Sequence, residues 1–213
     1  MRSACILLAA GEGRRIGFRK QFVEVCGKPL YMYSLEKALK VFEEVILVVP
    51  EDVMDRVPVP EGVKKVAGGK ERQDSVLNGI LETEAEVVVI HDSVRPLATE
   101  DMFREVSALG EYDGKIVAVP SRDTLKEVSG EAVLRTVDRS HMWLSQTPQG
   151  FKRKVLLECH FRARNEGFLG TDDASLLERY GYRVGIVLGS YWNVKVTYRE
   201  DLQFLERLLC KEI

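Results

Sequence analysis

Residues 4–15 read ACILLAAGEGRR, and this stretch is the strongest indication of the fold. Its first six residues, Ala4–Ala9, are apolar without alternation, which is typical of a strand buried on both faces of a parallel sheet. Gly11 and Gly13 follow at once. Ligands of open α/β sheets bind beyond the carboxyl ends of the strands, so we expect the loop after Ala9 to face a ligand.

Further apolar runs alternate with helical patterns along the chain. Each run is short, and most are followed by apolar residues at helical spacing. This alternation predicts an α/β fold with a doubly wound, mostly parallel sheet and right-handed crossovers. The expected strands are 4–9, 45–49, 87–90, 116–119 and 183–188, and the expected helices begin after Pro29 and Gly69, lie around 102–106, begin near Lys152, span 173–180 and lie around 202–209.

The alternation stops after Pro120. Residues 124–128 and 131–137 are rich in β-formers and flank Ser129-Gly130, a pair that is typical of a hairpin turn. We therefore interpret residues 1–213 as a single domain with an inserted β-arm at about 122–151. An arm of this kind would pack on a second subunit.

The composition excludes several classes of protein. Lys and Arg number 31 against 33 Asp and Glu, and a net charge of −2 argues against a general nucleic-acid coat. The apolar runs are far too short to span a membrane, and no cleavage-site pattern follows Met1. We expect a soluble, cytoplasmic protein.

The spacing of the cysteines and the small number of Asn and Gln residues allow two further predictions. Cys5, Cys26, Cys159 and Cys210 form no C-x-x-C pair, so we expect free thiols, as is usual in a reducing cytosol. Only three Asn and five Gln accompany many Glu and Arg, which favours a heat-adapted source.

The first candidate site is the glycine loop itself. Gly11 and Gly13 allow close backbone approach and expose N–H groups to phosphate oxygens. The loop is not a P-loop, because no G-x-x-x-x-G-K-[ST] pattern is present, and it is not the dinucleotide fingerprint, because its third glycine falls one place late, at Gly17. A polyphosphate is favoured by four cations that follow within ten residues: Arg14, Arg15, Arg19 and Lys20. A tight turn with solvated arginines is the alternative.

Two further stretches lie at expected element boundaries. Residues 68–75, GGKERQDS, open a helix whose N–H groups favour anions or base carbonyls, with an ordinary helix cap as the alternative. Residues 91–96, HDSVRP, end a buried strand, where Asp92 would hold a divalent cation through oxygen. The alternative is an ion pair between Asp92 and Arg95. We interpret His91 as a packed histidine.

Polar clusters recur late in the chain, at 147–149, 171–173 and 193–197. Singly, each is more typical of a cap or turn. Together with these clusters, Arg153 and Lys195 supply two more cations. The sequence contains neither a G-x-S-x-G nucleophile elbow nor a zinc ligand set.

In chain order the motifs are AAGEGRR, KQ, GGKERQDSV, HDSVRP, TVDR, TPQ, TDDAS and NVKVT. Eight motifs in this register resemble the 2-C-methyl-D-erythritol 4-phosphate cytidylyltransferases of the non-mevalonate isoprenoid pathway. The resemblance runs from Ala4 to about Leu205. It implies a Rossmann-like, nucleotide-diphospho-sugar-transferase-like fold with a β-arm that joins a homodimer. It also implies that CTP and the methylerythritol phosphate react with Mg²⁺ to give 4-diphosphocytidyl-2-C-methyl-D-erythritol and pyrophosphate, without nucleic acid or membrane as a partner.

The same resemblance implies roles for individual residues. The residues that would contact cytidine, its ribose or its phosphates are Ala9, Ala10, Gly11, Gly13, Gly69, Ser75, Asp92 and Ser93. Those that would act in catalysis are Arg15, Lys20, Arg153 and Lys195. Those that would hold the methylerythritol phosphate are Arg95, Thr136, Arg153, Thr171 and Lys195. Mg²⁺ would be held by Asp92, directly or through water, and Arg153 would reach in from the partner subunit.

Two positions depart from the family pattern. Lys70 stands where many relatives carry Asp, so a contact to the base or ribose would differ there. Gly150 stands where a bulky residue is common, so the shape beside Arg153 would differ.

Two other functions stay open. One is a cytidylyltransferase for another polyol phosphate, such as ribitol 5-phosphate. The other is a nucleotide-binding regulator without catalysis. A mere binder needs fewer cations than Arg15, Lys20 and Lys195 provide.

Overall fold

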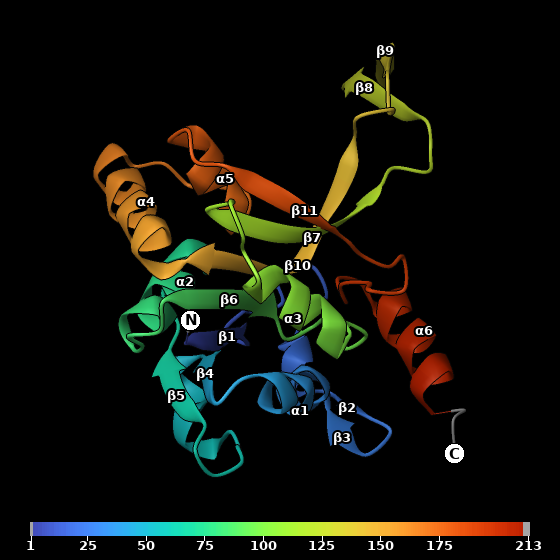
Figure 1. The fold of residues 1–213 in the computed structure, drawn as a ribbon. Helices are drawn as coiled ribbons and strands as arrows, with labels where there is room; N and C mark the ends of the chain where they lie inside the picture. Colours follow the sequence, from blue (N-terminus) through green and yellow to red (C-terminus); the bar gives the residue numbers. More distant parts are fainter. Residues whose placement is uncertain (1, 211–213) are drawn as a thin grey trace.

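A computed structural model describes residues 2–210 and builds them around one seven-stranded sheet (Figure 1). Neighbouring strands are parallel except where β10 pairs with β6 and β7. This confirms the mostly parallel, doubly wound α/β prediction. From edge to edge the strands are β11 (Val184–Leu188), β7 (Gly114–Pro120), β10 (Trp143–Lys152), β6 (Val87–Asp92), β1 (Ser3–Leu8), β4 (Glu44–Val49) and β5 (Lys64–Ala67).

The inner strand β1 is buried on both faces, as its unbroken apolar run predicted. Cys5 and Leu7 point into one core, and Ile6 points into the other, because successive side chains of a strand alternate. Helices cover both faces (Figure 1). The first core is closed by α1 (Leu30–Val41) and α3 (Glu100–Ser107), and the second by α2 (Arg72–Leu81), α4 (Arg153–Glu166) and α5 (Asp173–Arg179).

The strand order reverses direction at β1. The chain continues from β1 to β4 and β5 on one side, and then returns to place β6 on the other side. Such a reversal opens a crevice at the carboxyl ends of the two strands that flank it. Here Leu8 pairs with Asp92, and the Ser93 N–H donates to the Leu8 carbonyl at 3.0 Å. The loop after β1 and the residues after β6 therefore meet in that crevice.

The predicted hairpin is confirmed, but the inserted segment is shorter than the predicted 122–151, because β10 belongs to the central sheet, where it pairs with β6 and β7. Strands β8 (Leu125–Ser129) and β9 (Ala132–Val137) form a separate antiparallel pair that projects from the body of the molecule (Figure 1). Gly130 makes the turn with a positive φ of 57°, which glycine adopts without strain. Large apolar side chains on this hairpin face solvent, since Val133 and Leu134 are each 60% exposed.

The C-terminal helix α6 (Arg199–Leu209) packs near the first loop of the chain. That loop continues through the 3-10 turn η1 (Lys20–Phe22) into a small hairpin of β2 (Glu24–Val25) and β3 (Lys28–Pro29). On α6, Leu202 and Leu205 are buried in one cluster with Val25. A third cluster of apolar residues thus fixes the end of the chain beside the crevice.

A disulfide joins Cys26, in the turn between β2 and β3, to Cys210, just after α6. The expectation that all four cysteines carry free thiols is therefore wrong for this pair and right for the buried Cys5 and Cys159. No local pattern signals the pair, because 184 residues separate partners whose Cα atoms lie 5.5 Å apart.

Two elements lie between β4 and α2, where the sequence pattern predicts neither a strand nor a helix. They are the 3-10 segment η2 (Glu51–Arg56) and the edge strand β5, whose sequence KKVA lacks the apolar pattern of the inner strands. In the described part of the chain, none of the helices combines the length and the apolar character that crossing a bilayer requires.

Candidate active site

A cavity of about 360 Å³ lies in the crevice at the carboxyl ends of β1 and β6. It brings together most of the residues that the sequence singled out for the nucleotide. From the predicted set, its walls contain Ala9, Ala10, Gly11, Gly13, Arg15, Lys20, Gly69, Ser75, Asp92, Ser93 and Lys195. Stretches more than 180 residues apart in the sequence thus meet in one site.

The glycine loop offers the cavity unpaired N–H groups. The Ala9 N–H is bound by the Val48 carbonyl, but residues 10–13 find no acceptor for theirs within the described residues 2–210. Gly13 has a φ of 67°, and a Cβ there would collide with the carbonyl of Phe18. Unpaired N–H groups on a glycine loop are suited to phosphate oxygens or base carbonyls.

Of the four cations in the loop, three line the cavity and one does not. Arg14, Arg15 and Lys20 line it. Arg19 instead pairs with Glu12 at 2.9 Å and with Asp52 at 2.8 Å, so it stabilises the loop from outside.

Lys20 is the buried cation of this group, with 9% of its surface exposed. Burial lowers the pKa of its ammonium, and the nearby positive charges of Arg15 and Lys195 lower it further. An anionic ligand would relieve both effects, because it would neutralise the charge that the site concentrates.

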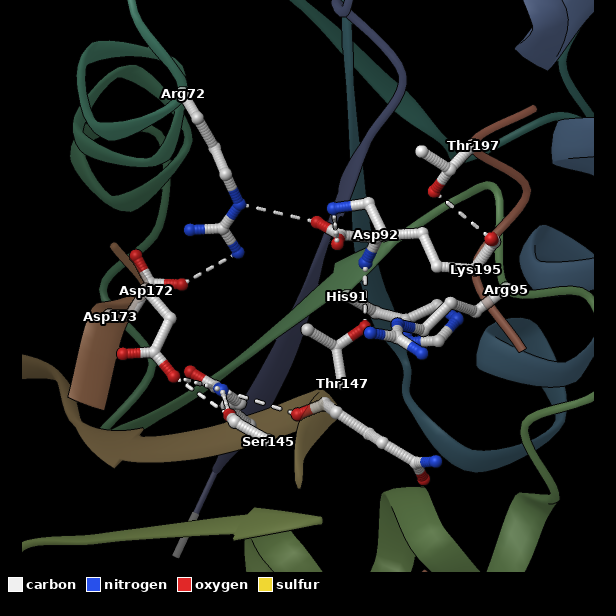
Figure 2. Close-up of polar contacts among 12 residues, drawn as sticks. Arg72, His91, Asp92, Arg95, Ser145, Thr147, Asp172, Asp173, Lys195 and Thr197 are labelled. Carbon is white, nitrogen blue, oxygen red and sulfur yellow. Dashed lines mark hydrogen bonds and ion pairs between the residues drawn. The ribbon is translucent and has the colours of Figure 1, made fainter. Parts of the chain in front are cut away.

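Asp92 lies at the centre of the site (Figure 2). Its two carboxylate oxygens accept from Lys195 Nζ at 2.6 Å and from Arg72 Nε at 3.2 Å. Burial alone would raise the pKa of this carboxyl, but the charges of Lys195 and Arg72 outweigh burial and hold the pKa well below its ordinary value. The alternative ion pair with Arg95 is not formed, because Arg95 donates to the Asn193 carbonyl at 2.7 Å.

A second cavity of about 250 Å³ adjoins the first. The two share Arg72, Asp92 and Lys195 as walls. Arg95 and Thr171, both predicted to hold the second substrate, line this cavity. Within the described residues, the buried Arg95 Nε has no hydrogen-bond partner, and a buried polar group without a partner is suited to a ligand.

Thr147 supports Asp92 from behind. Its hydroxyl oxygen accepts from the Asp92 N–H at 3.0 Å and lies 3.0 Å from His91 Nδ1 (Figure 2). Burial lowers the pKa of His91 to about 3, so this ring is neutral and packs against Phe103, as a packed histidine should. Thr147 also lines the second cavity.

Sequence reasoning assigned no role to Arg72, Thr147 or Gln21, although each lies inside a quoted motif. Arg72 bridges Asp92 and Asp173. Its Nη2 lies 2.9 Å from Oδ2 of the buried Asp173, at the start of α5. The available signal was position: Arg72 opens the helix that follows the Gly68-Gly69 pair. Only the folded chain places its guanidinium against Asp92.

Arg153 lines neither cavity of its own chain. It opens α4 at the far end of β6, where its neighbour Lys152 pairs with Val87, the first residue of that strand. Its guanidinium donates to the Ile80 carbonyl at 3.3 Å and pairs with Glu84 at 3.1 Å. Strand β10 runs antiparallel and carries Arg153 away from both cavities and from the arm of its own chain. Its predicted role at the site of a partner subunit stays a prediction.

Thr136 lies on the arm, in β9, and lines neither cavity. Its hydroxyl accepts from Lys126 Nζ at 2.7 Å. Within one chain, the structure therefore does not bring Thr136 to the second substrate's site.

The two departures from the family pattern have different settings. Lys70 is exposed at the wall of the first cavity. Gly150 packs in the core, where a Cβ would collide with the Val106 carbonyl of α3. A bulky residue is excluded at Gly150 by this close approach of α3.

Comparisons with known proteins agree with this geometry. Residues 3–211 match the family described as 2-C-methyl-D-erythritol 4-phosphate cytidylyltransferase. The chain is 64% identical to the enzyme of that name from Aquifex aeolicus over 97% of this chain and 98% of that one, and 41% identical to the one from Halalkalibacterium halodurans over 100% and 99%.

Solved structures give the same result. The 4-diphosphocytidyl-2C-methyl-D-erythritol synthase of Anaerococcus prevotii matches with a TM-score of 0.87 at 30% identity, covering 98% of this chain and 96% of that one. The cytidylyltransferase of Thermus thermophilus matches with a TM-score of 0.82 at 31% identity, covering 95% and 96%. The predicted resemblance is confirmed, and the chain belongs to the 2-C-methyl-D-erythritol 4-phosphate cytidylyltransferase family of nucleotidyltransferases.

Proposed function

We propose that the protein transfers CMP from CTP to 2-C-methyl-D-erythritol 4-phosphate, which gives 4-diphosphocytidyl-2-C-methyl-D-erythritol and pyrophosphate. The observation that carries this proposal is the pair of adjoining cavities that share Arg72, Asp92 and Lys195. A nucleotide in the first cavity and a polyol phosphate in the second would meet at this shared wall. Its two cations would face both sets of phosphates.

The first cavity suits a pyrimidine nucleotide. The unpaired N–H groups of residues 10–13 supply donors for base carbonyls or phosphates, and Gly69 and Ser75 line the opposite wall. Gly68 allows the two walls to approach, because a Cβ there would collide with the Ala10 methyl. We expect this close approach to favour the smaller pyrimidine ring, so CTP should be preferred over ATP and GTP.

The reaction needs positioning and charge stabilisation more than a protein nucleophile. A phosphate oxygen of the polyol phosphate attacks the α-phosphorus of CTP in line, and the bond to the leaving pyrophosphate breaks. The difficulty is repulsion between two anions. Arg15, Lys20 and Lys195 surround the first cavity and would stabilise the charge that develops there.

The residues present fit a Mg²⁺ ion held mainly by substrate. Within residues 2–210, no three side chains of His, Cys, Asp or Glu gather into a metal-binding group. All three carboxylates at the first cavity already have partners: Glu12 pairs with Arg19, Glu71 caps α2, and Asp92 accepts from Lys195 and Arg72. Among these three, Asp92 is the one that also lines the second cavity, where the phosphates of the two substrates would meet. Mg²⁺ commonly binds one carboxylate together with phosphates and water. When bound, it would neutralise triphosphate charge, with Asp92 as its protein contact, directly or through water.

The arm is proposed to join a homodimer and to serve the neighbouring site. The arm's four cations are Arg122, Lys126, Arg135 and Arg139. Arg122 stacks on Tyr191, Lys126 bonds Thr136, and Arg135 pairs with Glu127. Arg139, in the TVDR motif, is exposed and has no side-chain partner within the described residues. We therefore propose Arg139, beside Thr136, as the cation that the arm offers to a partner.

We expect the enzyme to act in the cytoplasm, where CTP is available. The decisive test is pyrophosphate release from purified protein with CTP, Mg²⁺ and a panel of methylerythritol, erythritol and ribitol phosphates. The methylerythritol phosphate should give the highest kcat/KM. Faster turnover of ribitol 5-phosphate would identify a different polyol cytidylyltransferase, comparable turnover with ATP would contradict the nucleotide assignment, and binding without pyrophosphate release would indicate a regulator.

A further inference from the structure

We infer that Gln21 is a positioning residue for nucleotide transfer, which holds the loop at residues 9–13 in the shape that presents its N–H groups to the nucleotide. Gln21 lies in η1 directly after Lys20 and is 2% exposed. The inference rests on the proposed function, because it concerns the same nucleotide cavity. It assigns a task to a buried amide that does no chemistry of its own.

The contacts of Gln21 connect two separate parts of the site. Its side-chain Nε2 donates to the Ala9 carbonyl at 2.7 Å and to the Gly11 carbonyl at 2.9 Å. Both hydrogens of the amide are therefore used on the loop. Within residues 2–210, the other hydrogen bonds of the backbone from Ala9 to Gly17 lie at its two ends: the Ala9 N–H donates to the Val48 carbonyl, and the Ile16 and Gly17 N–H groups donate to the Gly13 carbonyl.

Peptide geometry converts these two bonds into an orientation of the loop. In a planar trans peptide, the carbonyl of one residue and the N–H of the next point in opposite directions. By holding the carbonyls of Ala9 and Gly11, Gln21 also fixes the N–H groups of Ala10 and Glu12. These are two of the four loop N–H groups that lack an acceptor in the described chain. The donors are thus oriented before the nucleotide arrives, which lowers the entropic cost of binding.

The same turn also places the catalytic ammonium. Lys20 and Gln21 are neighbours in η1, so the segment that delivers Lys20 to the cavity is bonded to the glycine loop through Gln21. Loss of these bonds should therefore weaken CTP binding strongly. It should leave the second cavity unaffected, because neither Gln21 nor the loop lines it.

The test compares Gln21→Glu and Gln21→Met with Asn78→Asp. Asn78 is the matched control, because its side-chain amide also donates to a backbone carbonyl, that of Ala67 at 3.0 Å, outside both cavities. At pH 8 both Gln21 variants should raise the KM for CTP about tenfold or more, since each loses both hydrogen bonds to the loop. The KM for the methylerythritol phosphate should change less than twofold, and Asn78→Asp should alter only the unfolding midpoint.

A pH series separates positioning from a general loss of structure. The new carboxyl of Gln21→Glu would face two carbonyls, and once protonated it donates one hydrogen bond. Its KM for CTP should therefore fall towards the wild-type value between pH 8 and pH 6, whereas Gln21→Met should show no such recovery. If Gln21→Glu does not fold, Gln21→Met carries the comparison of the two KM values.

Two outcomes would overturn the inference. One is a wild-type KM for CTP in the Gln21 variants. The other is a parallel rise of both KM values, as a structural defect would cause. Failure of the proposed function is distinguishable, because the wild-type protein would then release no pyrophosphate from CTP, whatever residue 21 is.

Discussion

The loop at residues 9–13 follows a strand whose central residues are fully buried, whereas no residue of β8 or β9 is buried in the single chain. The loop is tied to its surroundings by Gln21, Val48 and the packing of Gly13. The arm carries Val128, Val133 and Leu134 on its surface, each at least 58% exposed. One chain thus completes the nucleotide side of the site, while the arm has the composition of a surface that another copy would cover.

The difference separates two kinds of defect. Changes on the nucleotide side should act within their own subunit. Changes on the arm should act on the neighbour, so they can be complemented in trans. Mixing subunits should therefore distinguish a variant of one kind from a variant of the other.

The largest effect is expected from Lys20→Ala. Lys20 is buried beside the cavity, and its ammonium would act on charge that develops at the α-phosphorus. Loss of one such contact costs about 10²–10³ in rate, so kcat should fall by that factor while CTP binding changes far less. Steady-state kinetics with calorimetric CTP binding would measure both. Arg15→Ala should show the same pattern, and near-normal kcat in both variants would contradict the role of the loop.

The pH dependence of kcat/KM should reveal the same lysine. Because burial and neighbouring cations lower the pKa of Lys20, it loses its proton below the ordinary lysine value of 10.5. In the free enzyme, kcat/KM should therefore fall about tenfold per pH unit above that lowered pKa. In Lys20→Arg, which keeps its charge, the alkaline fall should move to higher pH. An unchanged profile in Lys20→Arg would exclude Lys20 as the titrating group.

On the acid side of the profile, protonation of Asp92 should not lower kcat/KM until the pH is well below 3.8. Its pKa is depressed by Lys195 and Arg72, so the carboxylate stays ionised as the pH falls. The acid limb of the same profile provides this measurement, with Asp92→Asn as the comparison.

A mixed dimer tests the arm. Arg139→Ala should inactivate the site of the partner subunit, whereas Lys20→Ala should inactivate the site of the subunit that carries it. Co-expression puts half of the dimers in the mixed state, where one of two sites is whole, so about a quarter of wild-type activity is the expected ceiling for a two-fold dimer. A verified mixed dimer without activity would contradict the division between loop and arm. Arg153→Ala alone should keep wild-type kcat unless Arg153 acts at the site of a partner subunit, because within its own chain Arg153 lies at the far end of β6.

What the sequence could predict depended on the range of the interactions. The buried strand at residues 4–9, the glycine loop and the hairpin turn at Ser129-Gly130 are local patterns, and the structure contains all three. The place of Arg153 in the fold could not be predicted, for a different reason. Its position near the TPQ motif suggested a site residue, but the antiparallel course of β10 carries it to the opposite end of β6. Closeness to a motif in the sequence does not show in which direction the chain runs through the sheet.

Side-chain pairs between distant segments could not be predicted from the sequence either. Arg72 meets Asp92 across 20 residues, and Cys26 meets Cys210 across 184. Neither pair has a spacing rule, because each depends on where whole elements pack. The role of the Gln21 amide could not be predicted for a similar reason. Its partners are backbone carbonyls, and every residue has one.

The smallest effect on activity is expected from Cys26→Ser, on the nucleotide side. The disulfide closes a loop of 184 residues and holds α6 against the β2–β3 hairpin. A bridge of this kind typically contributes about 2–4 kcal/mol, so its loss should lower the unfolding midpoint by roughly 10 °C. Because Lys20 and Gln21 keep their own contacts, kcat/KM at 25 °C should change less than twofold. Wild-type protein in reductant should match the variant, and thiol titration of denatured wild type without reductant should find two thiols. Four titratable thiols would contradict the bridge. The C-terminal helix would then be held by the packing of Leu202 and Leu205 without a covalent link.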